Sequence, residues 1–380
     1  MTSTVRAEPD ATAERADIHP ESAVVVASQW RLIWWRFRRH RLAMLGLAVT
    51  VLLYSVVIFA DFLAPYSAGY SRAEFTYAPP MVPHLDIGDA NVYVHEYASE
   101  RDPETFERTW TVDRSSRTKI GLFVHGEEYK LLGLFTTDIH LFGPTSGVDG
   151  PPLFLLGSDK DGHDLLSRVI LGARVSMSIG LVGVGMAFGV GTVLGAISGY
   201  VGGRVDTAIQ RLVELFTSLP TLPLWMALAA AVPTDWSPLR RYFAITIILS
   251  FIAWTDLARV VRGRFLALRE TDVVTAARLD AARQPRIIFR HLLPSMYSHL
   301  IASLSLSIPA MILAETSLSF LGLGLQPPTV SWGVLLQAAQ NVRALATAPW
   351  LLLPGLAVVI AVLALNFLGD GLRDAADPYK

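Results

Sequence analysis

Six long apolar segments constrain the fold of this chain more strongly than any other feature of its sequence. A helix needs about 20 apolar residues to cross the roughly 30 Å hydrocarbon core of a bilayer, and each segment is about that long. In lipid every backbone polar group must be hydrogen-bonded within the protein, so such segments are helical. We predict an all-α polytopic membrane protein with six transmembrane helices, at residues 42–62, 175–197, 212–232, 243–261, 300–321 and 350–368.

The composition excludes several other classes of function. Of the 380 residues, 52% are hydrophobic and 17% are charged, and a formal net charge of -1 gives no reason to expect nucleic acid as a partner. Cysteine is absent, which excludes disulfides, thiol nucleophiles and cysteine-ligated metals. No lysine stands in the Gly-Lys-Ser/Thr context of a P-loop. We therefore expect a subunit that is not an enzyme and binds no cofactor itself.

Arginines set the predicted orientation of the spans. Short loops rich in Lys and Arg stay in the cytoplasm, and the opposite short loops carry only a few arginines here. We therefore predict that both termini lie in the cytoplasm. The basic residues on that side are Arg31, Arg36, Arg38, Arg39, Arg41, Arg204, Arg259, Arg262, Arg264, Arg269, Arg278, Arg283, Arg286, Arg290, Arg373 and Lys380.

The spans divide the chain into regions. Residues 1–27 are polar and lack the apolar core of a signal peptide, so we expect a disordered cytoplasmic tail. Residues 28–65 hold a basic amphipathic segment and the first span. Residues 66–153 are predicted to form an extracytoplasmic insertion, and residues 154–380 to form the core with the other spans.

The predicted insertion differs from the rest of the chain in its periodicity. Polar and apolar residues alternate in the stretches 91–98, 105–112 and 128–135, with aromatic and β-branched residues among them. This alternation is typical of strands, so we predict a small, mostly β subdomain.

Prolines and glycines modify the predicted spans. A proline inside a helix removes a hydrogen bond, so we expect kinks at Pro220, Pro223, Pro309 and Pro354. Glycines recur along the second span, where small side chains let helices approach each other closely. We expect a helix-packing surface there.

The loop 270–294, between the fourth and fifth spans, combines small and basic residues. Its first part clusters Ala276, Ala277 and Ala281, and Pro285 then suits the first turn of a second helix that ends at Pro294. One interpretation is an interfacial helix whose arginines rest on anionic lipid headgroups. The other is a docking element, in which alanines permit close approach and arginines add charge-assisted hydrogen bonds. Periodicity alone does not separate the two.

This loop resembles the "EAA" loop of ABC importer permeases, in which Glu-Ala-Ala precedes a Gly and a run ending in His-Leu-Leu-Pro. The resemblance assigns ATPase coupling to Thr275, Ala276, Ala277, Ala281, Arg286, Arg290, His291 and Pro294. Two residues depart from the pattern, because Thr275 replaces the Glu and Ala281 replaces the Gly. A left-handed alanine costs roughly 1–2 kcal/mol, so we expect the turn to move toward residues 282–284 or the first helix to lengthen.

Other segments resemble the C-type permeases of the dipeptide, oligopeptide and nickel group, over about residues 28–66 and 153–380. They are "WWRFRRHRLAMLGL", "LLGSDKDGHDLLSRVILGARVSMSIG", "ISGYVGGRVDTAIQRLVE", "ETSLSFLGLGLQPPTVSWG" and "LNFLGDGLRDAADPYK". The resemblance implies the six-span fold of type I ABC importers in the inner membrane of a prokaryote. It also implies a second homologous permease, two ATP-binding subunits that hold ATP and Mg²⁺, and an extracytoplasmic solute-binding protein.

The implied function is the pore-forming subunit of an ATP-driven importer of di- and oligopeptides. Oligosaccharides and nickel complexes remain alternative cargoes within the same family. An ion-driven secondary transporter is a different class, but such proteins usually contain internal repeats, and we see none here. A scaffold or receptor with a sensing outer subdomain is a third possibility.

Ionisable residues near the spans are candidates for a translocation path or gate. Charged groups at membrane depth are costly and usually face water or a bundle interior. Glu315 lies within the fifth span, where a path position and a buried structural hydrogen bond are equally compatible with the sequence. Arg211 and Glu214 are three residues apart, which also suits a structural ion pair near the cytoplasmic interface.

An acidic cluster precedes the second span. It contains Asp159, Asp161 and Asp164, with His163 between them. The spacing rejects an EF-hand, because its sixth and twelfth positions would be Asp164 and Ile170 instead of Gly and Glu. A calcium site of another kind is a weak candidate. The more ordinary use is an N-cap, since Asp164 stands just before the predicted helix.

Overall fold

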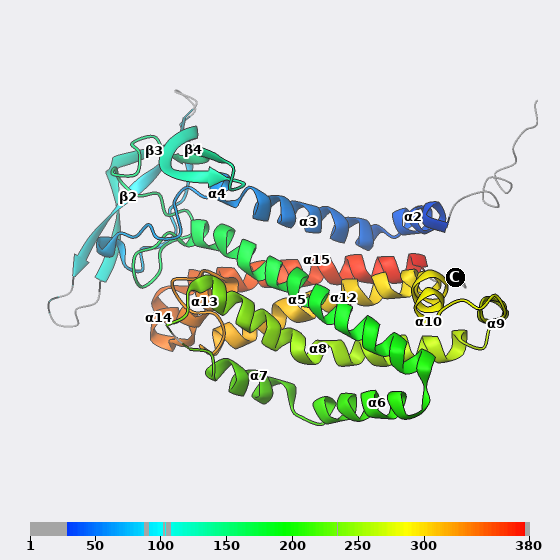
Figure 1. Ribbon diagram of the computed structural model, residues 1–380. Coiled ribbons are helices and arrows are strands. Elements are labelled where there is room, and N and C mark those ends of the chain that lie inside the picture. Colours follow the sequence, from blue (N-terminus) through cyan, green and yellow to red (C-terminus); the bar gives the residue numbers. More distant parts are fainter. Residues whose placement is uncertain (1–28, 87–90, 102, 104–107, 234, 377–380) are drawn as a thin grey trace, which may run out of the picture.

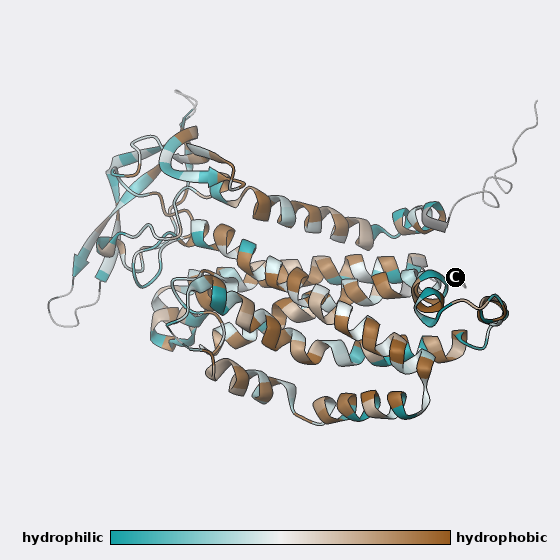
Figure 2. Cartoon of the chain, viewed as in Figure 1, coloured by the Kyte–Doolittle hydropathy of each residue, from teal (hydrophilic) through white to brown (hydrophobic). Residues whose placement is uncertain are grey.

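The computed structural model describes residues 29–86, 91–101, 103, 108–233 and 235–376, and the predicted tail at 1–27 lies outside them. Long helices run side by side, with a small sheet at one end (Figure 1). Apolar residues cover the long helices, while the sheet is more polar (Figure 2). Among the described residues, 5 helices are long and apolar enough to cross a membrane. They are α3 (Arg41–Ile58), α5 (Leu165–Val201), α8 (Pro238–Leu268), α12 (Tyr297–Phe320) and α15 (Leu353–Ala376).

The predicted third span is broken. Instead of one helix over 212–232, the chain forms α6 (Gly203–Thr217) and α7 (Thr221–Ala230), which are bent by 83°. Pro220 has extended backbone angles and precedes α7 directly. It offers no amide hydrogen and disfavours a helical conformation at the residue before it, so the helix ends there. The pair counts as a sixth span only if both parts are taken together.

The other predicted kinks have different outcomes. Pro309 lies inside α12. Pro354 falls in the first turn of α15, where a helical amide has no intrahelical acceptor to lose. A short helical turn over Pro349–Leu352 runs directly into α15 at this point, and the expected kink at Pro354 stays a prediction.

The core of the bundle is the contact between α5 and α8. A Cβ atom on Gly191 would lie 2.7 Å from the carbonyl oxygen of Trp254, and one on Gly195 would lie 2.5 Å from that of Ala258. Both distances are shorter than a van der Waals contact, so only glycine allows the two backbones to come this close. The packing surface predicted for the second span is present at these glycines. Buried side chains of α5, α8 and α12 fill the centre: Met177, Ile179, Ile245, Leu249, Ile312 and Leu318.

Two short helices flank the first span. α2 (Gln29–Arg39) precedes α3, and His40 caps α3 by accepting a hydrogen bond from the Ala43 amide at 3.0 Å. α4 (Ala60–Leu63) follows α3. The predicted helix over 42–62 therefore breaks at Phe59, which forms the end of α3 and the start of α4. α3 packs mainly against α15.

The segment between α4 and α5 contains a four-stranded antiparallel sheet in the order β1-β2-β3-β4. The strands are β1 (His84–Asp86), β2 (Asn91–Arg101), β3 (Arg108–Leu131) and β4 (Phe135–Pro144), after a short helix η1 (Ala73–Phe75). The stretch 128–135 is not one strand, because it contains the turn between β3 and β4. Residues 104–107, at the start of another predicted stretch, lie outside the described part of the chain.

Short helices join the long ones at both ends of the bundle. Near the sheet, α12 leads to α15 through α13 (Trp332–Gln337), η3 (Ala338–Gln340), α14 (Val342–Thr347) and η4 (Pro349–Leu352). At the opposite end, α8 leads to α12 through α9 (Asp272–Leu279), α10 (Gln284–Arg286), the π-helical turn η2 (Ile287–Leu292) and α11 (Leu293–Ser295). We call residues 270–296 the hairpin.

Candidate functional site

The hairpin turns at Ala281. This residue has φ +55°, in the left-handed region that alanine rarely adopts. The amides of Ala281 and Ala282 donate to the carbonyl oxygens of Arg278 and Ala277, both at 3.0 Å, and so close the end of α9. The expectation that the turn would move to 282–284 was wrong. The chain keeps the turn geometry of a glycine and places an alanine in it.

The alanines of the hairpin do not form one exposed face. Ala277 is buried together with Val274, and both belong to one apolar cluster with Ile287 and Ile288 of the second half and with residues of α5 and α8. Ala276 is exposed on the other side of α9. In the docking interpretation the alanines permit close approach, but Ala277 cannot contribute to this, because it is buried in the apolar core beneath the hairpin.

Exposed apolar side chains mark the outer face of the hairpin. Val273 is 64% exposed, Leu279 is 83% exposed and Phe289 is 53% exposed. Val273, Ala276 and Leu279 follow one another at every third position of α9 and therefore lie on one side of it; these three residues and Phe289 of η2 are what we call the outer hairpin face. A contiguous patch of apolar side chains this exposed is typical of an interaction surface.

The hairpin also carries exposed basic residues. Arg286 and Arg290 are exposed, whereas His291 is half-buried. Arg278 lies over the Tyr200 ring of α5, with 5.6 Å from the guanidinium carbon to the ring centroid. The remaining predicted coupling residues are Thr275, exposed on α9, and Pro294, exposed in α11.

An ion pair that the sequence did not predict joins α6 to α8 near the hairpin. Arg262 donates to both carboxylate oxygens of Asp206, at 2.5 and 2.6 Å. Asp206 also accepts a hydrogen bond from Ser198 of α5 at 2.5 Å. The two charged residues are 56 positions apart, so no local spacing could have revealed the pair.

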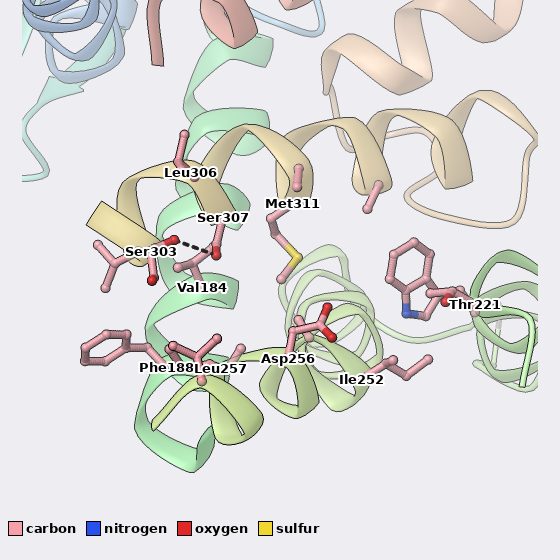
Figure 3. A pocket seen from close by; sticks show the side chains of 17 residues that line it. Val184, Phe188, Thr221, Ile252, Asp256, Leu257, Ser303, Leu306, Ser307 and Met311 are labelled. Atoms are coloured by element: carbon pink, nitrogen blue, oxygen red, sulfur yellow. Dashed lines mark hydrogen bonds between the residues drawn. The ribbon is translucent and has the colours of Figure 1, made fainter. Parts of the chain in front are cut away.

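A cavity of about 380 Å³ lies between α5, α7, α8 and α12 (Figure 3). Its wall is mainly apolar, with Ser303, Ser307 and Thr221 as neutral polar groups and Asp256 as its charged residue. The Asp256 side chain is 81% exposed and pairs with Arg259. This shape and lining suit a small organic molecule.

The sequence-predicted path residues lie elsewhere. Arg211 and Glu214 form an exposed ion pair on α6, with 2.8 Å from guanidinium nitrogen to carboxylate oxygen. The wall of the cavity in Figure 3, as far as the described residues form it, includes neither of them and not Glu315. For Arg211 and Glu214 the geometry matches the structural alternative.

Glu315 is fully buried in a cluster of serines. Its carboxylate accepts hydrogen bonds from Ser319 and Ser331 at 2.8 Å each and from Ser176 at 3.1 Å. Ser176 also accepts from the Trp332 amide at 3.1 Å. The cluster ties α5, α12 and the start of α13 together. Its geometry matches the structural role that the sequence left open for Glu315.

The acidic cluster before α5 is an ion-pair network. Asp159 pairs with Arg168, and both side chains are at most 10% exposed. The Asp159 carboxylate also accepts from the amides of Asp161 and His163, at 2.9 and 3.0 Å. Burial acts to raise the pKa of Asp159, but hydrogen bonds from His163 and the Arg168 charge outweigh it and hold the pKa below its ordinary value.

This network does not fit a calcium ion. Ligand atoms of Asp159, Asp161 and His163 lie within 4.8 Å of one another, but the Arg168 guanidinium already neutralises Asp159, and calcium prefers six to eight oxygen ligands to an imidazole nitrogen. Asp164 takes no part, because it caps α5 by accepting a hydrogen bond from the Ser167 amide at 2.7 Å. The predicted N-cap is confirmed. Burial raises the pKa of the Asp164 carboxyl to about 7, against the opposing effect of its Ser167 hydrogen bonds.

Comparison with known proteins decides the family. Residues 191–379 match the family of binding-protein-dependent transport system inner membrane components, and residues 28–80 match the N-terminal TM domain of oligopeptide transport permease C. The oligopeptide transport system permease protein OppC of Haemophilus influenzae is 37% identical over 243 residues, which are 64% of this chain and 75% of that protein. This chain belongs to the family of binding-protein-dependent transport permeases.

Other relatives of this permease carry similar descriptions. The OppC protein of Escherichia coli is 40% identical over 58% of this chain and 71% of its own length. The di/tripeptide transport system permease DppC of Pseudomonas aeruginosa is 38% identical over 63% of this chain and 77% of its own. An inward-facing structure of the MetNI methionine ABC transporter aligns with a TM-score of 0.43 at 19% identity, over 56% of this chain and 98% of that one. That likeness is too weak to add to the assignment.

Proposed function

We propose that this permease is the pore-forming subunit of an ATP-driven importer of di- and oligopeptides, in the inner membrane of a prokaryote. Its partners are a second homologous permease, two ATP-binding subunits that hold ATP and Mg²⁺, and an extracytoplasmic solute-binding protein. The chain itself carries out no covalent chemistry. The relatives in three bacteria that are described as peptide permeases support the cargo class.

The outer hairpin face is the observation that carries the proposal. It joins exposed apolar side chains to a rim of arginines, which is the composition of a protein docking surface. The hairpin sits between α8 and α12, two of the helices that line the cavity. When ATP closes the partner subunits, they push on the hairpin. The hairpin then shifts α8 and α12 between two packings that open the cavity to opposite sides.

The proposed orientation places both termini and the hairpin in the cytoplasm. Figure 1 shows α2, the hairpin and the C-terminal end of α15 at one end of the bundle, and the sheet at the other. Most of the arginines counted for the orientation lie at the first end, which agrees with the positive-inside rule. The sheet then faces the extracytoplasmic side, where a solute-binding protein would dock.

Uptake by the reconstituted complex tests the proposal. The permease is purified with its partner subunits and placed in proteoliposomes with ATP inside the compartment that the ATP-binding subunits face. Labelled tri-alanine is the probe, and maltotriose and a nickel–histidine complex are competitors. We expect tri-alanine uptake that needs ATP and persists when an ionophore dissipates ion gradients.

Leu279→Glu should lower this uptake at least tenfold by placing a charge in the docking surface. Val342→Glu is the matched control, because Val342 is 79% exposed on α14, at the other end of the bundle. Normal uptake by Leu279→Glu, or equal loss in both variants, would contradict the coupling role. The cargo class would be contradicted if labelled tri-alanine were not taken up. It would also be contradicted if maltotriose or the nickel–histidine complex lowered tri-alanine uptake more than other unlabelled peptides did.

A further inference from the structure

The β3–β4 hairpin exposes large apolar side chains. On β3, Leu122 is 72% exposed and Phe123 is 62% exposed. At the turn, Leu132, Leu134 and Phe135 are 55%, 75% and 68% exposed. Such side chains are costly in water when they gather on one supersecondary unit, and they mark a surface that another phase or molecule covers.

This apolar surface continues the membrane-facing side of the first span. Phe123 contacts Phe62 of α4, with 6.2 Å between ring centroids. At 1.5 Å per helical residue, Phe62 lies only about 6 Å beyond Ile58, the last residue of α3. Ile58 and Phe59 are themselves 50% and 43% exposed. Figure 1 shows β3 and β4 beside α4, the short helix that follows the first span.

The first span is the least buried of the five continuous spans that the structure describes. Only 17% of its apolar window is buried inside the chain, compared with 33% to 56% for the other continuous spans. Its exposed side chains are Leu42, Leu45, Val51, Leu52, Ile58 and Phe59. The apolar surface of the β3–β4 hairpin continues this row of side chains. The bilayer is therefore the surrounding that fits it.

Hydrogen bonds hold the β3–β4 hairpin in a fixed position relative to the first span. His140 of β4 is buried, and its ring nitrogens lie 2.6 Å from the carbonyl oxygen of Ala64 and 3.1 Å from that of Glu127. The Ser67 amide also donates to the Glu127 carboxylate at 3.2 Å. These contacts join β3 and β4 to the chain just after α4. They hold the β3–β4 hairpin beside the first span.

Backbone strain coincides with the apolar positions. Phe123 and Leu132 both have φ +53°, in the left-handed region that residues with a branched or bulky side chain avoid. Such strain persists where the surroundings favour it and often marks functional segments. In this sheet the strained backbone falls at Phe123 on β3 and at Leu132 in the β3–β4 turn, which are two of the exposed apolar residues.

We propose that the β3–β4 hairpin is a membrane-interface anchor. Leu122, Phe123, Leu132, Leu134 and Phe135 insert among the headgroups and upper acyl chains of the leaflet on the sheet's side, next to the first span. Aromatic and aliphatic side chains at this depth are typical of interfacial segments. The anchor sets the height and tilt of the sheet above the bilayer. It does not depend on the cargo or on ATP coupling.

Site-directed labelling tests the anchor, and the chain favours it because it contains no cysteine. Phe123→Cys and Leu134→Cys are each labelled with a nitrobenzoxadiazole fluorophore in the complete complex and reconstituted into phosphatidylcholine vesicles. The control is Val112→Cys, since Val112 is also an apolar residue of β3 and is 51% exposed. Spin-labelled lipids quench from two depths, and aqueous iodide quenches from water.

We expect headgroup-proximal spin labels to quench the dyes at 123 and 134 at least twofold more than the dye at 112. Iodide should show the reverse order. Two results would overturn the anchor: no lipid quenching at both 123 and 134, or protection from iodide that appears only when the binding protein or second permease is added. Leu134 lies in the exposed turn, so its variant keeps the test decisive if Phe123→Cys fails to fold.

Discussion

At the end of the bundle near the sheet, α5 begins in a network of buried charges, whereas at the opposite end apolar contacts hold the hairpin. Asp159 and Arg168 pair within the first network, and Asp164 caps the helix beside them. Val274, Ala277, Ile287 and Leu292 form the core of the hairpin. Charged hydrogen bonds need one geometry, but apolar burial is non-directional and tolerates sliding. The comparison suggests that the first end is a fixed frame and the hairpin is the part that moves.

Loss of Arg168 should have the largest effect. In Arg168→Met the Asp159 carboxylate stays buried without its cation, and breaking a buried pair in this way costs about 3–5 kcal/mol. Thermal unfolding of the purified complex, followed by tryptophan fluorescence, measures the loss. Lys160→Met is the control, because its partner Asp161 is 4.0 Å away and both side chains are exposed. An equal, small change in unfolding temperature in both variants would show that the Asp159–Arg168 network does not hold this end of the bundle rigid.

The next effect concerns pH and Asp164. Its pKa is about 7 in the folded protein and has an ordinary value of 3.8, so between these values the folded state holds a proton that the unfolded state has released. Stability therefore falls as pH rises through this window and is level above it, by at most about 4 kcal/mol at 1.36 kcal/mol per unit.

Asp164→Asn keeps the N-cap and cannot ionise. We expect it to exceed the wild type in unfolding temperature at pH 8 and to approach it at pH 5. Paired unfolding curves at both values measure this. A difference between the two proteins that does not change with pH would contradict the assigned protonation.

A smaller effect is expected inside the hairpin. Ala277→Leu overfills the core beside Val274 and Ile287, which typically costs about 1–3 kcal/mol. The same apolar cluster includes Ala196 and Tyr200 near the end of α5, so we expect faster hydrogen exchange in residues 272–292 and around these two residues, and little change at the start of α5 near Leu165. Ala276→Leu is the control, since Ala276 is exposed. If residues near Leu165 also exchange faster in Ala277→Leu, the two ends of the bundle are not independent.

The smallest change is expected at the hairpin turn. Ala281→Gly removes the cost of a left-handed alanine and should slow hydrogen exchange across the turn, by up to about 1 kcal/mol of local stability. The glycine also gains entropy when unfolded, which reduces the benefit. Ala282→Gly, at a position without positive φ, should instead speed exchange. The same direction in both variants would show that the turn is not strained.

Local chemistry was predictable from the sequence and tertiary pairing was not. The apolar runs located the long helices, and the spacing before Leu165 identified Asp164 as an N-cap. Pro220 and Pro223 signalled a disturbance in the third span, but not that the chain would turn by 83°. The Asp206–Arg262 pair and the Glu315–Ser176 hydrogen bond join residues 56 and 139 positions apart. Such contacts exist only after the helices pack.

The same limit explains the errors at the hairpin. Ala276 and Ala277 are adjacent and chemically identical, so only the packing of α9 on η2 decides which one is buried. At Ala281 the hydrogen bonds that end α9 outweigh the intrinsic preference of alanine. A residue's own preference therefore gave the wrong position for the turn.

The close contact of α5 with α8 makes these two helices a single lever. A helix of 37 residues is about 55 Å long, and glycine contacts fasten α5 to α8 without the side-chain layer that would let them shear. Because the Asp159–Arg168 pair holds α5 at the end near the sheet, a small rotation applied where α8 meets the hairpin turns both helices together about that end. The opposite end of this helix pair, beside the hairpin, therefore undergoes the larger displacement.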